Sequence, residues 1–248
     1  MTIQSQADLL GLMEIGNIVA MAIEEMKKSA KAGMTTLELD DIGARYLEKY
    51  GAKSAPRKSF RFPGHACISV NRDIAHGIPG NYKLQPGDLI NVDVCAEKDG
   101  YIADSGQSFQ LPPFSPEVSR LCSHTRHALM AIIGTLKHGV KISEIGRMME
   151  ASAAKNGYNV IENLCSHGVG RAIHEYPNIP PTYNKHDKRK LKEGMVIAIE
   201  PFFSTGADYV IEQPDGWTLR LPSDSLAAQF EHTIIITRDQ PIIVTAAS

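Results

Sequence analysis

A duplicated α/β unit, with two copies related by pseudo-two-fold symmetry, is the fold class that this sequence predicts. Helix-like and strand-like segments alternate along its 248 residues. Two sets of residues also recur at nearly the same spacing. One set is shifted by 106 positions, with Gly33, Glu38 and Gly51 recurring as Gly139, Glu144 and Gly157. The other is shifted by 107, with Leu84, Gly87, Ile90 and Asp93 recurring as Leu191, Gly194, Ile197 and Glu200. Offsets that agree this closely indicate an internal duplication.

The repeat has a direct consequence for chemistry, because it makes Asp93 and Glu200 equivalent carboxylates. A cysteine precedes His76 and His174 by nine positions in each case, so these two histidines form a second candidate pair. Pseudo-two-fold symmetry would bring all four side chains toward one central cleft.

Helices are expected in both halves of the chain. Residues 6–31 place apolar side chains near helical spacing and predict an amphipathic helix. A second helix is expected to begin at a threonine cap, Thr35 or Thr36, and to run to Tyr50 before a glycine stop. Residues 116–136 predict a third helix, with Pro116 and Glu117 in its first turn.

Strands and loops fill the remaining segments. Residues 67–70, 195–199 and 228–237 are rich in β-formers and each predicts one strand. Residues 53–64 contain prolines, a glycine and basic side chains, and predict a loop. Residues 206–226 are expected to be irregular, with a turn at Asp215-Gly216.

Residues 89–109 predict two strands joined by a turn within Lys98-Asp99-Gly100. A Lys98-Asp99 loop would place Asp93 and Asp104 directly opposite each other, whereas an Asp99-Gly100 loop would make them diagonal neighbours. In either register both carboxylates lie on the same face, because side chains alternate along a strand. Their repulsion costs about 0.2–1 kcal/mol, so a cation or a shared proton should compensate. The alternative interpretation is two aspartates at the solvated end of a hairpin.

Composition excludes several classes of protein. The net charge is −2 and Lys and Arg are dispersed, so no direct nucleic-acid binding is predicted. The four cysteines form no C-x-x-C pair, which favours a reduced, cytoplasmic protein. No apolar run approaches the roughly 20 residues of a membrane span, and no signal peptide is evident.

Five residues form a candidate metal site: Asp93, Asp104, His167, Glu200 and Glu231. The four acids lie on or beside apolar strands, where an unpaired charge is costly. One imidazole with several carboxylates suits Mn²⁺, Fe²⁺, Co²⁺ or Zn²⁺, and five such ligands fit two ions about 3.5–4 Å apart. Taken singly, each has an ordinary structural explanation, such as a satisfied loop histidine for His167 or a strand terminator for Glu200.

Such a site would perform hydrolysis. Two divalent cations lower the pKa of a shared water toward about 7 and polarise a carbonyl group. Glu200 is the expected proton shuttle between that water and the leaving amine. His76 or His174 would donate a hydrogen bond to the developing charge or to the peptide.

The chain resembles the type I methionine aminopeptidases of the M24 peptidases. The resemblance rests on His76-Gly-Ile-Pro, Asn91-Val-Asp93 with Asp104, Ser166-His167-Gly-Val-Gly with His174-Glu175, Ile199-Glu200-Pro201 and Gln229-Phe-Glu231-His232-Thr233. It extends from about Leu9 to Thr237. The stretch from His174 to Glu200 has no room for the helical insert of the type II enzymes, so the short bacterial-style form is implied.

The resemblance implies a "pita-bread" fold around a central antiparallel sheet. It implies one catalytic domain over residues 1–248, with half-repeats at about 9–110 and 116–240. It implies two divalent metal ions (Co, Mn, Fe or Zn), with Asp104 and Glu231 bridging them. His76 and His174 become the substrate-binding and catalytic histidines, beside Glu200.

The implied activity is hydrolytic removal of the N-terminal methionine from nascent proteins and peptides. The implied setting is the cytoplasm, with a monomeric enzyme meeting chains at the ribosome. Two alternatives remain: another pita-bread peptidase of the Xaa-Pro type, or a non-catalytic peptide-binding relative. The first usually carries a large N-terminal domain and the second usually loses metal ligands.

Three positions depart from the family pattern. Ile173 stands where an aromatic residue is usual, and Pro56 and Ser59 stand in place of a cysteine and a tyrosine. Cys67, Phe62 and Trp217 are the expected pocket walls. The metal chemistry is therefore expected more firmly than the methionine preference.

Overall fold

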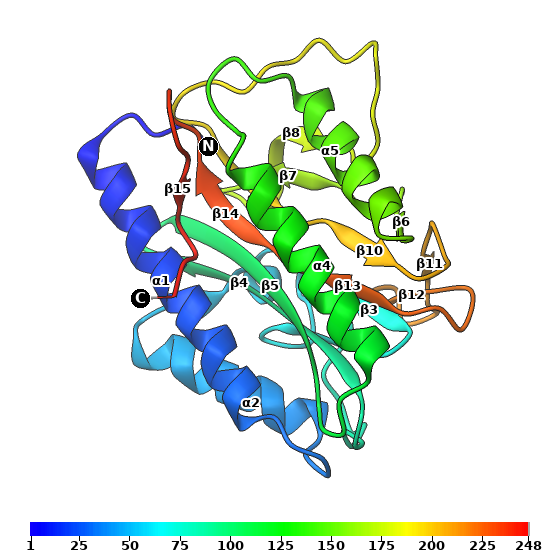
Figure 1. The fold of residues 1–248 in the computed structure, drawn as a ribbon. Helices are drawn as coiled ribbons and strands as arrows, with labels where there is room; N and C mark the ends of the chain where they lie inside the picture. The colour runs from blue at the N-terminus through cyan, green and yellow to red at the C-terminus, as the bar shows by residue number, and fades with distance from the viewer. Residues whose placement is uncertain (248) are drawn as a thin grey trace.

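The computed structural model describes residues 1–247. Its helices are α1 (Gln6–Ser29), α2 (Thr36–Lys49), α3 (Ala55–Phe60), α4 (Pro116–Ile133) and α5 (Ile142–Lys155). Helix α2 begins with a capping box, in which Thr35 and Glu38 each accept a hydrogen bond from the other's backbone nitrogen. Helices α1 and α4 cross in front of the long strands in Figure 1.

The strands form four antiparallel sheets. They are β1 (Lys53–Ser54), β2 (Cys67–Val70), β3 (Asp73–Ala75), β4 (Leu89–Lys98), β5 (Tyr101–Gln110), β6 (Asn159–Val160), β7 (Ser166–Gly168), β8 (Glu175–Ile179), β9 (Val196–Ile199), β10 (Phe202–Ser204), β11 (Ile211–Glu212), β12 (Leu219–Arg220), β13 (Ala227–Gln229), β14 (His232–Ile235) and β15 (Ile242–Ile243). Strand β4 pairs with β1, β2 and β5, while a five-stranded sheet has the order β15-β14-β9-β7-β8.

The two largest sheets meet along strands β5 and β14. Thr233 Oγ1 accepts from the Asp104 nitrogen at 2.9 Å and donates to the Asp104 carbonyl at 2.7 Å. One step further, the Glu231 nitrogen donates to the Gly106 carbonyl at 2.9 Å. These bonds join the two sheets along the seam, so strands from distant parts of the sequence lie side by side there.

Equivalent backbone contacts recur in the two halves. The Gly33 nitrogen donates to the Leu84 carbonyl at 2.8 Å, and the Gly139 nitrogen donates to the Leu191 carbonyl at 2.9 Å. Gly33 and Gly139 also share a left-handed backbone, with φ of 88° and 89°. The duplicated α/β unit and its pseudo-two-fold symmetry, predicted from residue spacing, are confirmed.

The same equivalence extends to the strands that carry the candidate site. Ser69 pairs with Asn91 on β4, and His167 pairs with Ala198 on β9. These pairs preserve the offset of 107 between Asp93 and Glu200. Ser69 and His167 are also separated by the same number of positions as His76 and His174.

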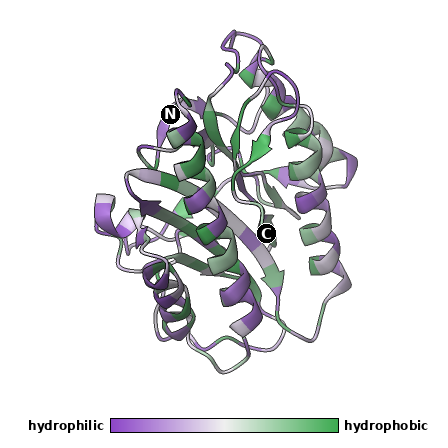
Figure 2. Ribbon diagram, turned by 90° about the vertical axis from the view of Figure 1, so that its left-hand side faces the viewer, coloured by the Kyte–Doolittle hydropathy of each residue, from purple (hydrophilic) through white to green (hydrophobic). Residues whose placement is uncertain are grey.

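The helices cover one face of the sheets and leave the other face for chemistry. Val92 and Val94 are fully buried in a core cluster with α1. Because side chains alternate along a strand, Asp93 and Cys95 point to the opposite face. Figure 2 shows largely hydrophobic strands and helices that are hydrophilic on their outer side.

Three of the expected elements are wrong. Residues 206–226 are not all irregular, because β11 and β12 lie within them and pair with each other. Residues 53–64 are not all loop, because Lys53–Ser54 pairs with β4 and Ala55–Phe60 forms α3, capped by the Ser54 hydroxyl. The single strand expected over 228–237 is two strands, β13 and β14, which join different sheets. The chain changes sheet at Phe230 and Glu231, and this change places Glu231 at the seam.

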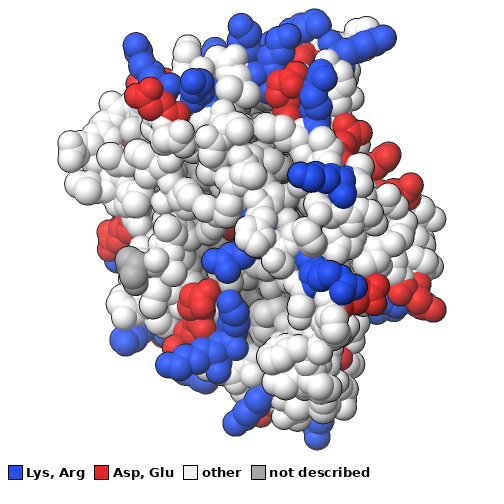
Figure 3. Space-filling view, in the orientation of Figure 1, with Lys and Arg blue, Asp and Glu red and all other residues white. Residues whose placement is uncertain are grey.

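On the face seen in Figure 3, acidic and basic side chains are mixed except in one region. Lys and Arg side chains gather over the loop between β8 and β9, at the top of Figure 3. This loop contains Lys185, Lys188, Arg189, Lys190 and Lys192. The basic residues are therefore less dispersed than the composition suggested. Among residues 1–247, no helix combines the length and apolarity needed to cross a membrane.

Candidate metal centre and substrate cavity

The structure brings all five predicted metal ligands to one small cavity. Asp93, Asp104, His167, Glu200 and Glu231 all line a space of about 220 Å³. Candidate ligand atoms of Asp104, His167 and Glu231 lie within 4.8 Å of one another. Glu200 Oε1 lies 3.3 Å from His167 Nε2.

The hairpin register settles one of the two alternatives left by the sequence. Lys98 pairs with Tyr101, so the loop is Asp99-Gly100. Both loop residues have left-handed backbones, with φ of 51° and 80°, as a type I′ turn requires. Asp93 pairs with Gly106 rather than with Asp104. The two carboxylates are therefore diagonal neighbours on one face.

His167 presents a defined nitrogen to the cavity. Its Nδ1 lies 2.9 Å from the Gly168 carbonyl oxygen. A carbonyl oxygen only accepts, so Nδ1 carries the proton. The other nitrogen, Nε2, faces the carboxylates and lies 3.3 Å from Glu200 Oε1. This arrangement is typical of a metal-binding histidine, whose other nitrogen donates to a carbonyl.

The buried carboxylates repel one another. Burial raises the pKa of Asp93, Glu200 and Glu231 well above their usual range, and the neighbouring acids add to each shift. Asp104 Oδ1 is fully buried and has no hydrogen-bond partner among residues 1–247. Native proteins seldom leave a buried polar atom unpaired. Clustered acids with an unpaired oxygen are the environment that a divalent cation would compensate, so the residues fit a metal site.

A larger, mainly apolar cavity adjoins the carboxylates. It measures about 480 Å³ and shares His76, Asp93, Asp104 and His174 with the smaller space. Its remaining lining residues are Pro56, Phe60, Phe62, Cys67, Cys95, Ile173 and Trp217. The ring centroids of Phe62 and Trp217 lie 5.1 Å apart in an edge-on contact. Phe62, Cys67 and Trp217 are thus pocket walls, as predicted.

The two candidate histidines stand where the cavities meet. The His174 ring lies edge-on to His167, with 4.4 Å between centroids, and stacks on Phe60 at 6.1 Å. Loss of surrounding water lowers the pKa of His76 and of His174, and His167 adds to the shift of His174. Both imidazoles are therefore neutral at pH 7, able to donate or accept one hydrogen bond at each nitrogen.

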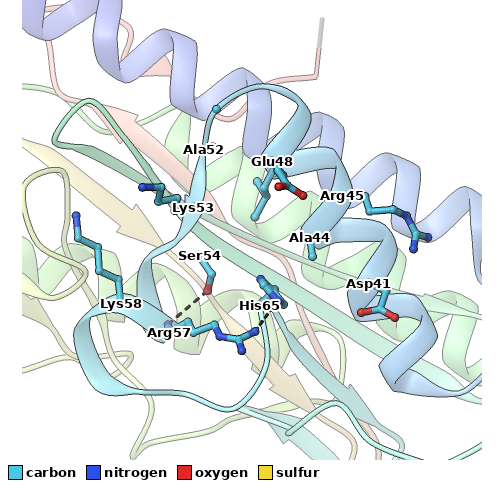
Figure 4. Close-up of a pocket in the computed structure, with 12 residues that line it drawn as sticks. Asp41, Ala44, Arg45, Glu48, Ala52, Lys53, Ser54, Arg57, Lys58 and His65 are labelled. Atoms are coloured by element: carbon cyan, nitrogen blue, oxygen red, sulfur yellow. Dashed lines mark hydrogen bonds between the residues drawn. The ribbon is translucent and has the colours of Figure 1, made fainter.

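Another cavity, of about 730 Å³, lies beside α2, β1 and α3 (Figure 4). Arg57 and His65 point toward each other there, and Arg57 Nη1 lies 2.5 Å from His65 Nε2. Its charged lining mixes acids and bases, and it contains none of the five clustered ligands. Volume alone therefore does not locate the chemistry.

The family model for metallopeptidase family M24 matches residues 11–238. Methionine aminopeptidase 2 of Bacillus subtilis is 45% identical over 247 residues, which is 99% of each chain. The methionine aminopeptidase of Staphylococcus epidermidis is 43% identical, over 99% of this chain and 98% of its own. The chain belongs to the methionine aminopeptidases of family M24. It is accordingly a metal-dependent aminopeptidase.

Solved structures agree with the family. The methionine aminopeptidase of Thermotoga maritima superposes with a TM-score of 0.94 at 30% identity, covering 99% of each chain. The prolidase of Pyrococcus furiosus reaches 0.80 at 19% identity, covering all of this chain and 66% of its own. The second likeness shows the fold alone. Both confirm the pita-bread fold predicted for this M24 chain.

Three residues at the M24 site have a position or contact that the sequence did not indicate. Phe60, the last residue of α3, lines the cavity although it is partly exposed to solvent, and a loop prediction over 53–64 did not indicate this position. Cys95 lies beside Asp104 across the hairpin, a position that follows from the register alone. Gln229 donates to Glu231 Oε2 at 3.0 Å. A polar residue inside a run of β-formers was the available signal for Gln229.

Proposed function

We propose that this enzyme hydrolyses the first peptide bond of newly made proteins and peptides that begin with methionine. The observation that supports the proposal best is the convergence of His167 and four carboxylates beside an apolar cavity of about 480 Å³. An unbranched thioether fits such a cavity, because its lining is mostly aromatic, aliphatic and thiol groups.

We assign the metal site to two divalent ions. Asp93, Asp104, His167, Glu200 and Glu231 would hold them, with Asp104 and Glu231 shared between the two positions. The oxygen-rich donor set with one imidazole suits Mn²⁺, Fe²⁺, Co²⁺ or Zn²⁺. When bound, such ions supply Lewis acidity, which lowers the pKa of water and polarises a peptide carbonyl.

Glu200 is the residue we assign to proton transfer. It lies at the end of β9, and its backbone nitrogen donates to Ser166 Oγ at 3.0 Å, which fixes the strand end. Its carboxylate faces the cavity beside His167. A carboxylate held beside the reacting groups can accept a proton from water and pass it to the leaving amine.

His76 and His174 are assigned to the substrate. Both line the two adjoining cavities, so their rings border the scissile bond of a peptide whose first side chain fills the larger one. A neutral imidazole can donate to the peptide carbonyl oxygen, where charge develops during attack. Neither is among the three clustered ligand residues described above.

The setting of the reaction is also part of the proposal. We infer a monomer of one catalytic domain, residues 1–248, with half-repeats near 9–110 and 116–240. We place it in the cytoplasm, acting on chains as they leave the ribosome, without direct contact to nucleic acid. Sedimentation of the purified protein tests the monomer, and fractionation of cell extracts tests the location.

Turnover of matched tripeptides tests the proposed function. Metal-free protein is reloaded with Mn²⁺ and given Met-Ala-Ser, Leu-Ala-Ser, Pro-Ala-Ser and N-acetyl-Met-Ala-Ser, and the released amino acid is measured. We expect free methionine from Met-Ala-Ser and no release from the acetylated peptide. Faster release of proline would instead indicate an Xaa-Pro peptidase. Binding of Met-Ala-Ser without turnover, at full metal loading, would indicate a non-catalytic relative.

A further inference from the structure

Behind the carboxylates lies a chain of buried amides that ends on two of the proposed metal ligands. Gln229 is the last residue of β13 and is 1% exposed. Its side-chain Nε2 donates to Glu231 Oε2 at 3.0 Å. The same side chain also interacts with Glu200. An amide nitrogen carries two hydrogens, so one is bound to Glu231 and the second is available to Glu200.

The orientation of this amide is fixed from its other side. Gln229 Oε1 accepts from Asn91 Nδ2 at 2.7 Å, and the Gln229 backbone nitrogen donates to Ser108 Oγ at 2.9 Å. Asn91 Nδ2 also lies 3.2 Å from Ser108 Oγ. If the Gln229 amide were reversed, its oxygen would face a carboxylate oxygen and its nitrogen would face a donor. The network therefore has one favourable arrangement.

The Gln229 amide packs closely against the backbone of strand β5 at Gly106. A Cβ at Gly106 would come within 2.1 Å of Gln229 Oε1 and 2.6 Å of Nε2. Gly106 also accepts the hydrogen bond of the Glu231 nitrogen across the seam. The absence of a side chain at position 106 thus lets the Gln229 amide pack directly on strand β5.

We propose that Gln229 is a positioning residue of the metal centre, whose amide ties Glu200 to Glu231 and aims both carboxylates into the ligand cluster. Asn91 is the residue that orients this amide. The proposal rests on the proposed function in one respect, namely that Glu200 and Glu231 bind the metal. It goes further because it gives a shared support to two ligands that come from different strands.

The geometry explains why a donor is needed at this point. Glu231 and Glu200 lie in a cluster of acids, and no Lys or Arg side chain among the described residues forms an ion pair with either; the only such contact is that of Glu200 with His167. A fixed amide holds one oxygen of Glu231 without adding charge, so the other oxygen remains for a ligand position. Outer partners of this kind are typically worth about 10–100-fold in metal affinity.

Metal titration of full-length variants tests the proposal. Gln229→Met keeps the side-chain length and removes the donor, and Gln107→Met, on the neighbouring strand, is the matched control. Each protein is stripped of metal and titrated with Mn²⁺ by calorimetry, and the absorption spectrum of its Co²⁺ form is recorded. We expect Gln229→Met to weaken Mn²⁺ binding about 10–100-fold and to change the Co²⁺ spectrum, while Gln107→Met changes neither.

A second variant separates positioning from packing. Asn91→Ala leaves the Gln229 donor in place but frees its orientation, so it should weaken Mn²⁺ binding in the same direction and to a smaller extent. If Gln229→Met does not fold, the Mn²⁺ affinity of Asn91→Ala still tests the proposal. At saturating Mn²⁺ both variants should lower kcat with little change in KM. Wild-type Mn²⁺ affinity and Co²⁺ spectrum in either folded variant would overturn the proposal. Failure of the wild-type chain to bind metal would instead overturn the proposed function.

Discussion

Replacing Glu200 by glutamine separates metal binding from proton transfer. Glu200→Gln keeps the size of the side chain and one ligand oxygen, but removes the basic site. A positioned general base contributes about 10²–10⁴-fold, and the lower bound corresponds to about 2.7 kcal/mol. The neutral His76 and His174 line the same cavity and can carry some protons. We therefore expect kcat for Met-Ala-Ser to fall at least about 10²-fold, rather than to vanish.

The same substitution has a predicted effect on stability. In metal-free protein, burial and then Asp93 and Asp104 raise the pKa of Glu200 above that of an unfolded chain. The folded state then binds more protons, so Glu200 makes stability fall as pH rises from about 4.3 through its raised folded pKa. A glutamine at position 200 does not titrate, so it causes no such loss of stability. Metal-free Glu200→Gln should therefore unfold at a higher temperature than wild type at pH 8, and the gap should close near pH 4.

The assay combines three measurements on one preparation. The Mn²⁺ content is measured by elemental analysis, kcat is measured at saturating Mn²⁺, and the unfolding temperature is measured after metal removal. Glu193→Gln, an exposed acid paired with Arg238, is the control. Wild-type kcat in metal-saturated Glu200→Gln would refute proton transfer by Glu200. A metal-free variant less stable than wild type at pH 8 would refute the electrostatic account.

Three further outcomes are expected. Chelation should abolish turnover and Mn²⁺, Co²⁺ or Fe²⁺ should restore it; full turnover by protein shown to be metal-free would contradict the site. His76→Ala and His174→Ala should each lower kcat/KM by about 10²–10⁴-fold with metal content unchanged, whereas His127→Ala on α4 should not. Loss of metal from either variant would reassign that histidine as a ligand. Because the pKa values of His76 and His174 are lowered, kcat/KM should hold at pH 6.5 and fall only in more acidic buffer; a fall already centred near pH 7 would argue against neutral histidines.

Much of the site could be predicted because its ligands lie in strongly patterned strands. The alternation around Asp93 and Asp104 fixes their common face in either register, and the repeat relates Asp93 to Glu200 before any contact is known. The register itself depended on which residues take left-handed backbones. Asp99 and Gly100 do so, and a sequence containing Lys98-Asp99-Gly100 allows more than one choice.

The errors have equally specific causes. The prolines, glycine and basic residues of segment 53–64 are typical of a loop, although Pro56 in the first turn after a Ser54 cap also begins a helix. The break between β13 and β14 has no local signal, because β-formers continue through Phe230. It is imposed by the seam, where the Glu231 nitrogen turns to the Gly106 carbonyl. Partners so distant in sequence could not be inferred from the strand itself.

The intact mass of a protein substrate tests the central claim most directly. A purified protein beginning Met-Ala is incubated with Mn²⁺-loaded enzyme, and its mass is followed by spectrometry beside an N-acetylated copy. The account predicts loss of one methionine from the unblocked protein, no further trimming, and no change in the acetylated copy or after chelation. An unchanged mass at full metal loading, or continued loss of residues after the methionine, would contradict it.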